Sequence, residues 1–155
     1  MTPALRQELR QRKPFTSLCQ EAFLNISRTE TVLVDAMERV LKPHGLAMTQ
    51  YNVLRMLRGA GDEGLCRNEI RDRLISRMPD VTRLLDRMED AGLVSRVRSE
   101  EDRRLVRTSL TRRGRTLVDR LDEEVDAEHA RQLGHLTREQ LQTLVGLLTL
   151  ARAQA

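Results

Sequence analysis

Apolar residues recur every three or four positions along most of the chain, a spacing typical of amphipathic helices. The first predicted helix is long and covers residues 15–42, and it ends before Pro43 and Gly45. The second covers residues 48–61, where Thr49 is the expected N-terminal cap and glycines close the helix. The N-terminal part of the chain is therefore expected to be mostly helical.

Two more helices are predicted next, a short one over residues 64–74 and a longer one over residues 78–93. The second of these has the clearest amphipathic pattern in the chain. Its ends are also marked, since Pro79 suits the first turn and Gly92 ends the helix. Its apolar positions follow the i, i+3, i+4, i+7 rule and are Val81, Leu84, Leu85 and Met88. This helix is expected to bury one face and to present a charged face outward.

The period of the pattern then changes from about 3.6 to about 2, which predicts strands. Residues 94–98 and 105–111 alternate, and the charged sequence SEEDRR separates them, so a β-hairpin with a polar tip is expected. Two further helices follow. Thr111 is the predicted cap of one, and Thr137 with Gln140 forms a capping box for the other.

The predicted order is four helices, a hairpin and two helices, which indicates a mainly α fold with a small β-hairpin wing. We expect one domain over residues 1–155, in which residues 46–111 form a winged helix-turn-helix unit. Residues 15–42 and 112–153 carry apolar stripes outside this unit. A second copy of the chain would cover these stripes, so the N- and C-terminal segments are expected to be dimerisation helices.

The chain is basic, and the excess charge is concentrated in its middle. The net charge is +4, and residues 65–114 hold 13 basic and 9 acidic residues, whereas residues 115–155 hold 5 and 7. The only aromatic residues are Phe15, Phe23 and Tyr51. Because proteins usually bind RNA loops and single strands by stacking bases on aromatic rings, the composition favours duplex DNA as the partner.

Several other functions find no support in the sequence. Two cysteines make no disulfide framework, and the histidines His44, His129 and His135 lack metal-ligand spacing. No apolar run reaches the roughly 18 residues of a membrane span, and the N-terminus lacks the apolar core of a signal peptide. Nucleophile motifs, phosphate-binding loops and paired carboxylates are also lacking. We therefore expect a cytoplasmic protein that is not an enzyme and needs no cofactor or metal.

Residues 79–114, PDVTRLLDRMEDAGLVSRVRSEEDRRLVRTSLTRRG, resemble the recognition helix and wing of the MarR family of bacterial transcription regulators. The resemblance rests on the acidic-Arg-Arg tip and on the closing L-T-x-x-G, here Leu110, Thr111 and Gly114. It implies an obligate homodimer that binds a near-palindromic operator in double-stranded DNA and usually represses transcription. A small aromatic or phenolic effector, bound between the dimerisation helices and the DNA-binding unit, would release the operator. Cys66 departs from the family, whose third helix usually begins with a Thr or Ser cap.

The first group of predicted DNA contacts lies on the fourth helix. A helix in the major groove needs short polar and long basic side chains on one face. Thr82, Arg83 and Arg87 meet that need, and Arg77 and Pro79 lie near the start of the helix. The alternative interpretation is a solvated face on which acidic neighbours offset the arginines.

The second group lies on the wing, where Arg104 is the expected minor-groove residue. The family's D-x-R pattern implies that Asp102 holds an arginine side chain in position. Arg103 and Arg107 are expected to contact phosphates, which adds affinity without reading sequence. The alternative is a hairpin tip that is charged only for solubility.

Two alternative functions stay open at the level of the sequence. Some MarR relatives sense organic peroxides through a reactive cysteine in the first helix, and Cys19 is the candidate for such an oxidant sensor. Its neighbours Leu18, Ala22 and Phe23 are apolar, so a small buried side chain is the preferred interpretation. The other alternative is a winged-helix protein-interaction module that does not bind DNA.

Overall fold

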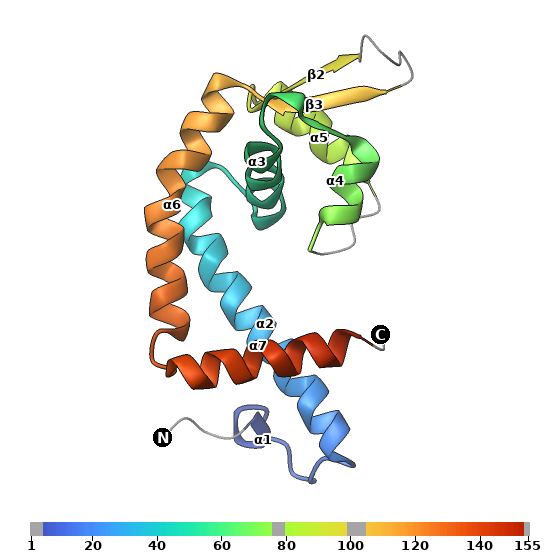
Figure 1. Ribbon diagram of the computed structural model, residues 1–155. Coiled ribbons are helices and arrows are strands. Elements are labelled where there is room, and N and C mark those ends of the chain that lie inside the picture. The colour runs from blue at the N-terminus through green and yellow to red at the C-terminus, as the bar shows by residue number, and fades with distance from the viewer. Residues whose placement is uncertain (1–4, 76–79, 99–104, 154–155) are drawn as a thin grey trace. The chain divides into compact units, whose positions relative to one another are not determined.

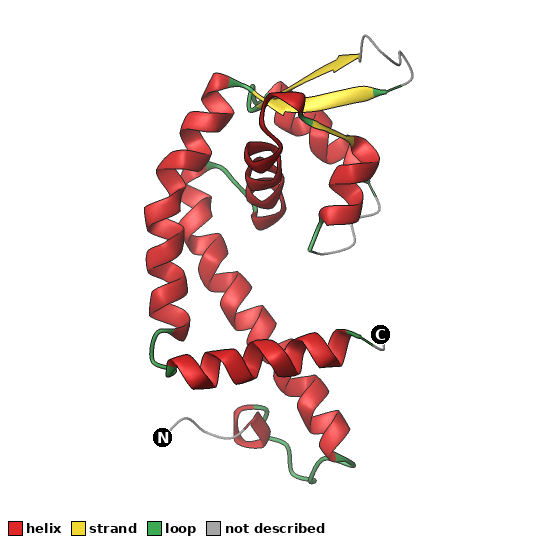
Figure 2. Cartoon of the chain, in the orientation of Figure 1, coloured by secondary structure: helices red, strands yellow, loops and turns green. Residues whose placement is uncertain are grey.

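The computed structural model of the chain describes residues 5–75, 80–98 and 105–153 (Figure 1). The chain forms two compact units, residues 1–36 and residues 37–155. It is mostly helical with one small antiparallel sheet, as Figure 2 shows. The predicted fold class is therefore confirmed.

The first unit contains the short helix α1 (Leu5–Glu8), which the sequence does not predict, and most of α2 (Leu18–Leu41). The hydroxyl of Ser17 accepts a hydrogen bond of 3.1 Å from a backbone N–H of the first turn of α2. A 3₁₀ turn, Lys42–His44, follows the end of α2. The predicted helix over residues 15–42 is thus confirmed, with its start at Leu18.

The second unit holds the remaining elements, which are, in chain order, α3 (Met48–Ala60), the 3₁₀ turn Gly61–Glu63, β1 (Leu65–Cys66), α4 (Arg67–Arg73), α5 (Val81–Asp90), β2 (Val94–Arg98), β3 (Val106–Leu110), α6 (Arg112–Leu133) and α7 (Arg138–Arg152). The strands form an antiparallel sheet in the order β1-β3-β2. The register pairs Val94 with Leu110 and Arg98 with Val106, so the predicted hairpin is confirmed. The third strand, β1, is a feature that the sequence does not predict.

The core of the second unit lies between its helices and the sheet, and Figure 1 shows α3 between α6 and the α4–α5 pair. The predicted apolar face of α5 belongs to this core. Its most deeply buried side chains include Val53, Leu54, Leu57, Ile70, Leu85, Met88, Val118 and Leu121. Because these residues come from four helices, burial of apolar surface fixes α5 against the rest of the unit.

The start of α3 is as predicted, but its cap differs from the prediction. The helix begins at Met48, and the Ala47 N–H donates to Gln50 Oε1 at 2.9 Å. The prediction of Thr49 as the cap is wrong, because Thr49 lies inside the helix. Gln50 thereby supplies one half of a capping box, in which the side chain at the third helical position accepts from the backbone N–H of the N-cap residue.

The start of α4 differs from the prediction, since the helix begins at Arg67 and not at residue 64. Leu65 and Cys66 pair with β3 instead. The backbone N–H of Cys66 donates to Glu69 Oε2 at 2.7 Å, and this bond lowers the pKa of Glu69. The N-terminus of α4 is therefore stabilised without the hydroxyl cap that the family usually has at this position.

The two helices after the wing begin as predicted. Thr111 Oγ1 accepts a hydrogen bond from Gly114 N at 3.0 Å and caps α6. At the start of α7, the Thr137 N–H donates to Gln140 Oε1 at 2.9 Å, and the Gln140 N–H donates to Thr137 Oγ1 at 3.2 Å. The capping box is thus confirmed.

Candidate nucleic-acid interface

Helix α5 is fixed at both of its ends. At the N-terminus, Asp80 Oδ1 accepts a hydrogen bond of 2.9 Å from Arg83 N, so Asp80 is the cap. At the C-terminus, Gly92 has a φ of 68°, and the Leu93 N–H returns to the Met88 carbonyl at 3.0 Å. The predicted stop at Gly92 is confirmed, whereas the helix begins at Val81 rather than at residue 78.

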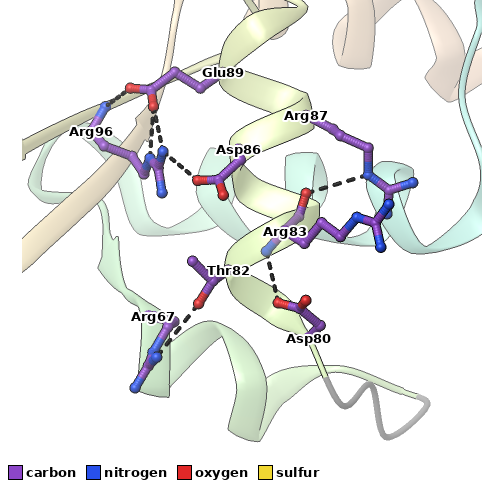
Figure 3. A network of polar contacts seen from close by, with 8 residues as sticks. All are labelled: Arg67, Asp80, Thr82, Arg83, Asp86, Arg87, Glu89 and Arg96. Atoms are coloured by element: carbon purple, nitrogen blue, oxygen red, sulfur yellow. Dashed lines mark hydrogen bonds and ion pairs between the residues drawn. The ribbon is translucent and has the colours of Figure 1, made fainter.

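The outward face of α5 carries the predicted contact residues Thr82, Arg83 and Arg87, and Figure 3 shows how they lie on the helix. Arg87 Nε donates to the Arg83 carbonyl at 3.3 Å. Within the described ranges, neither arginine forms an ion pair with a carboxylate. The structure therefore brings two long basic side chains and a short hydroxyl together on one face, which is the set of groups that major-groove contacts require.

The acidic neighbours of these arginines have other partners. Asp80 caps the helix, and Asp86 contacts Arg96 on β2. Among the described residues these two carboxylates therefore do not pair with Arg83 or Arg87, and the choice between a DNA-binding face and a solvated face stays a prediction. The positive charge of Arg83 and Arg87 stays available to an external anion.

Arg96 connects the wing to α5 (Figure 3). Its Nε donates to Glu89 Oε2 at 2.8 Å, its Nη2 lies 2.6 Å from Asp86 Oδ1, and its backbone N–H donates to Glu89 Oε1 at 3.1 Å. The hydrogen bond to Glu89 is the main cause of a raised pKa of Arg96. These contacts fix the base of the wing against the helix that carries the predicted base-reading residues.

Arg67 is a residue at this surface that the sequence does not single out. It is the first residue of α4, and its Nη1 lies 3.5 Å from Thr82 Oγ1 on α5. Together with Val106 of the wing, Arg67 and Thr82 line a groove between α4, α5 and β3. Only the packing of α4 against α5 brings Arg67 here, and no local sequence signal marks it.

The predicted contacts at the tip of the wing and at the start of the fourth helix lie outside the described residues. These are Arg77, Pro79, Asp102, Arg103 and Arg104. Arg107, which is described, donates from Nη1 to the carbonyls of Glu63 and Gly64 at 3.4 Å each. Its guanidinium therefore supports the loop before β1, and its predicted phosphate contact stays a prediction.

The structure changes the interpretation of Cys19, which is exposed, so the expectation of a buried side chain is wrong. Its use as an oxidant sensor stays a prediction.

The described part of the chain contains no group of three His, Cys, Asp or Glu residues that could hold a metal ion. His44 Nε2 instead lies 3.0 Å from Glu124 Oε2.

No helix in the described ranges has the length and apolar character needed to cross a membrane.

Comparison with known proteins agrees with this geometry. Residues 35–121 match the family model described as transcriptional regulator SarA/Rot. A MarR transcription factor from Planctomyces limnophilus is 43% identical and has a TM-score of 0.67, with 88% of this chain and 99% of that chain covered. The HTH-type transcriptional repressor Rv2887 of Mycobacterium tuberculosis is 34% identical over 113 residues, which are 73% of this chain and 80% of the relative.

A third comparison concerns the fold alone. A mutant of MarR from E. coli, solved in complex with operator DNA, has a TM-score of 0.78 at 24% identity, covering 88% of this chain and 99% of that one. The winged helix-turn-helix geometry and the similarity over most of the sequence lead to the same conclusion. The chain belongs to the MarR family of DNA-binding transcription regulators.

Proposed function

We propose that the chain is a repressor that binds a near-palindromic operator in duplex DNA as a homodimer and is released by a small effector. The observation that carries this proposal is the outward face of α5, where Thr82, Arg83 and Arg87 stand on a helix fixed at both ends. Such a helix presents its donors to base edges without first having to be ordered. The two recognition helices of a dimer would enter major grooves about one helical turn, or ~10 bp, apart.

The wing supplies the second part of the proposed interface. Arg104 is our candidate for the minor groove, with Asp102 holding an arginine in position and Arg103 contacting phosphate. Arg77 and Pro79 complete the candidate set near the start of the recognition helix. The network around Arg96 supports this part of the proposal, because it fixes the base of the wing relative to α5.

Dimerisation is supported by apolar side chains that lie in solvent on the terminal helices. On α2, Leu18 is 80% and Phe23 is 68% exposed, and on α7, Val145 is 65% and Leu150 is 70% exposed. Exposed apolar side chains of this number on two helices are typical of an association surface. We propose that residues 15–42 and 112–153 form the dimer interface, residues 46–111 bind DNA, and the whole chain acts as one domain.

The remaining parts of the proposal follow from the family. We propose a small aromatic or phenolic effector that binds between the dimerisation helices and the DNA-binding unit. The protein would act in the cytoplasm and associate with the nucleoid when bound to DNA. The family regulates transcription and is not a family of enzymes.

The test is selection of duplexes from a random-sequence library by the purified chain, followed by binding titrations at several salt concentrations. A repressor of this kind selects an inverted repeat, and its affinity falls steeply with salt because counterions are released from DNA. We expect Arg83→Gln or Arg87→Gln to weaken binding to the selected duplex by about 1–3 kcal/mol if these residues read bases. Arg12→Gln, which removes the same charge from an exposed position outside the DNA-binding unit and the dimerisation segments, is the control. A protein-interaction module would select no duplex and would have no salt-dependent affinity for DNA.

A further inference from the structure

An arginine on α3 joins the predicted DNA-binding unit to α6. Arg58 Nη1 lies 2.7 Å from Asp122 Oδ2 and 3.0 Å from Asp119 Oδ1, and Arg58 Nη2 lies 3.0 Å from Asp122 Oδ1. The guanidinium thus binds one carboxylate with two parallel hydrogen bonds and reaches a second carboxylate one helical turn away. We call these contacts the Arg58 clamp.

The clamp is not needed to hold α3 and α6 together. Leu54 and Leu57 of α3 and Val118 and Leu121 of α6 are completely buried in one apolar core. The clamp lies at the rim of this core, where the side chains of Arg58, Asp119 and Asp122 are 28%, 52% and 46% exposed. Ion pairs at such exposure contribute little to the free energy of folding.

The Arg58 clamp adds a constraint on the orientation of α3 relative to α6. Apolar contacts are not directional, so two packed helices can tilt or slide slightly at small cost. A planar guanidinium bound at two atoms to one carboxylate fixes orientation as well as distance. The clamp also lowers the pKa of Asp122, mainly through the hydrogen bond from Arg58, so that the carboxylate stays charged.

A second fixed point shows why orientation matters here. Thr111 binds Gly92 O at 2.7 Å, and its hydroxyl caps α6 at Gly114, so the N-terminus of α6 is attached to the base of the wing. Asp122 lies eight residues beyond Gly114, which is about 12 Å along a helix. Two attachments separated by this length set the direction of α6 relative to α3 and the wing. The contact of His44 with Glu124 also reaches α6, but it comes from the turn before α3 and not from α3 itself.

From these observations we propose that Arg58 is a positioning residue, which sets the angle between the DNA-binding unit and α6 and thereby the separation of the two recognition helices in the dimer. The inference rests on the proposed homodimeric function. Gly114 and Leu133 are separated by about 28 Å of helix, so a tilt of about 5° at the base displaces the far end by roughly 2.5 Å. One base pair is about 3.4 Å, so such a tilt is comparable to a change of one base pair in half-site spacing.

The experiment measures the preference for half-site spacing. An inverted repeat selected by the wild-type chain is varied by one base pair in either direction, and the affinity of each duplex is titrated at fixed salt. We expect Arg58→Gln to reduce the preference for the selected spacing by at least about fivefold. Arg58→Lys, which keeps the charge but loses the two-atom geometry, is expected to reproduce most of that reduction.

Two further variants separate positioning from charge and stability. Arg12→Gln removes an exposed arginine outside both the DNA-binding unit and the dimerisation segments, and it should leave the spacing preference unchanged. The triple variant Arg58→Gln, Asp119→Asn, Asp122→Asn removes the repulsion between the two carboxylates, and it should still have the reduced preference. An unchanged spacing preference in Arg58→Gln, whatever its thermal stability, would overturn the inference. A wild-type chain that selects no duplex would instead contradict the proposed function.

Discussion

The turn from the wing into α6 offers a sharp prediction at Gly114. A Cβ atom at this position would lie 2.0 Å from the Leu93 carbonyl oxygen and 3.0 Å from its carbonyl carbon. These are backbone atoms, so no side chain can rotate away. The same carbonyl accepts hydrogen bonds from the Thr111 N–H at 3.1 Å and from Thr111 Oγ1 at 3.2 Å, so its displacement would weaken the cap of α6.

The expected cost of Gly114→Ala follows from these contacts. Overpacking costs about 1–3 kcal/mol, and a weakened cap adds about 1 kcal/mol. The higher helix propensity of alanine offsets about 0.5–1 kcal/mol of this destabilisation. We therefore expect a net loss of about 1–3 kcal/mol, or a decrease in Tm of roughly 2–4 °C for each kcal/mol in a chain of this size.

Gly59→Ala is the matched control, because Gly59 is an exposed residue of α3 and a Cβ atom there would meet nothing within 4 Å. The same substitution should stabilise the protein here by about 0.5–1 kcal/mol. Urea denaturation of wild type and both variants at one protein concentration measures the difference. A Gly114→Ala protein as stable as Gly59→Ala would refute the steric reasoning.

Two other predictions address the interface and the dependence on pH. Arg67→Ala should weaken DNA binding and reduce the slope of log affinity against log salt by about 1 if Arg67 contacts a phosphate. Arg12→Ala, which removes an exposed arginine outside the DNA-binding unit, should not change the slope. Equal slopes for Arg67→Ala and wild type would exclude the contact. Hydrogen bonds, the strongest from Arg131, lower the pKa of Glu128 to about 2 from 4.5, so its stabilising effect is present above pH 4.5 and is lost as the pH falls toward 2. Thermal melts between about pH 5 and pH 2.5 should therefore show a smaller fall in Tm for Glu128→Gln than for wild type, and an identical fall in the two proteins would contradict the assignment.

The sequence predicts the elements whose signals are local. The α5 pattern, the hairpin and the caps Thr111 and Thr137 are each determined by residues a few positions apart, and the structure confirms them. The strand β1 has only two residues, too few for a period of two to be visible. At α3, both a threonine and a glutamine lie in the first turn, and the sequence does not decide which one completes the cap.

In the candidate site, too, the sequence predicts the features that depend on local spacing and not those that depend on packing. Thr82, Arg83 and Arg87 share a face because of helical spacing, so the sequence predicts their common exposure. The contacts of Arg96 with Asp86 and Glu89 depend on the angle between β2 and α5, which local spacing does not determine. Pairs far apart in the sequence, such as Arg67 with Thr82 on a neighbouring helix, become visible only when the helices are packed.

The way in which α5 is held also limits how DNA binding is controlled. Asp80 fixes one end of this helix, the turn at Gly92 and the contacts of Arg96 fix the other, and its apolar face lies in the core. A change in the shape of α5 would break several of these contacts together, so a signal that releases DNA is expected to move the unit of residues 46–111 as a whole. The contacts that limit such a movement are those with α6, at the Thr111 cap and at Arg58. For the proposed function, the control of DNA binding is therefore expected to depend on the attachment of α6 as much as on the predicted recognition helix α5.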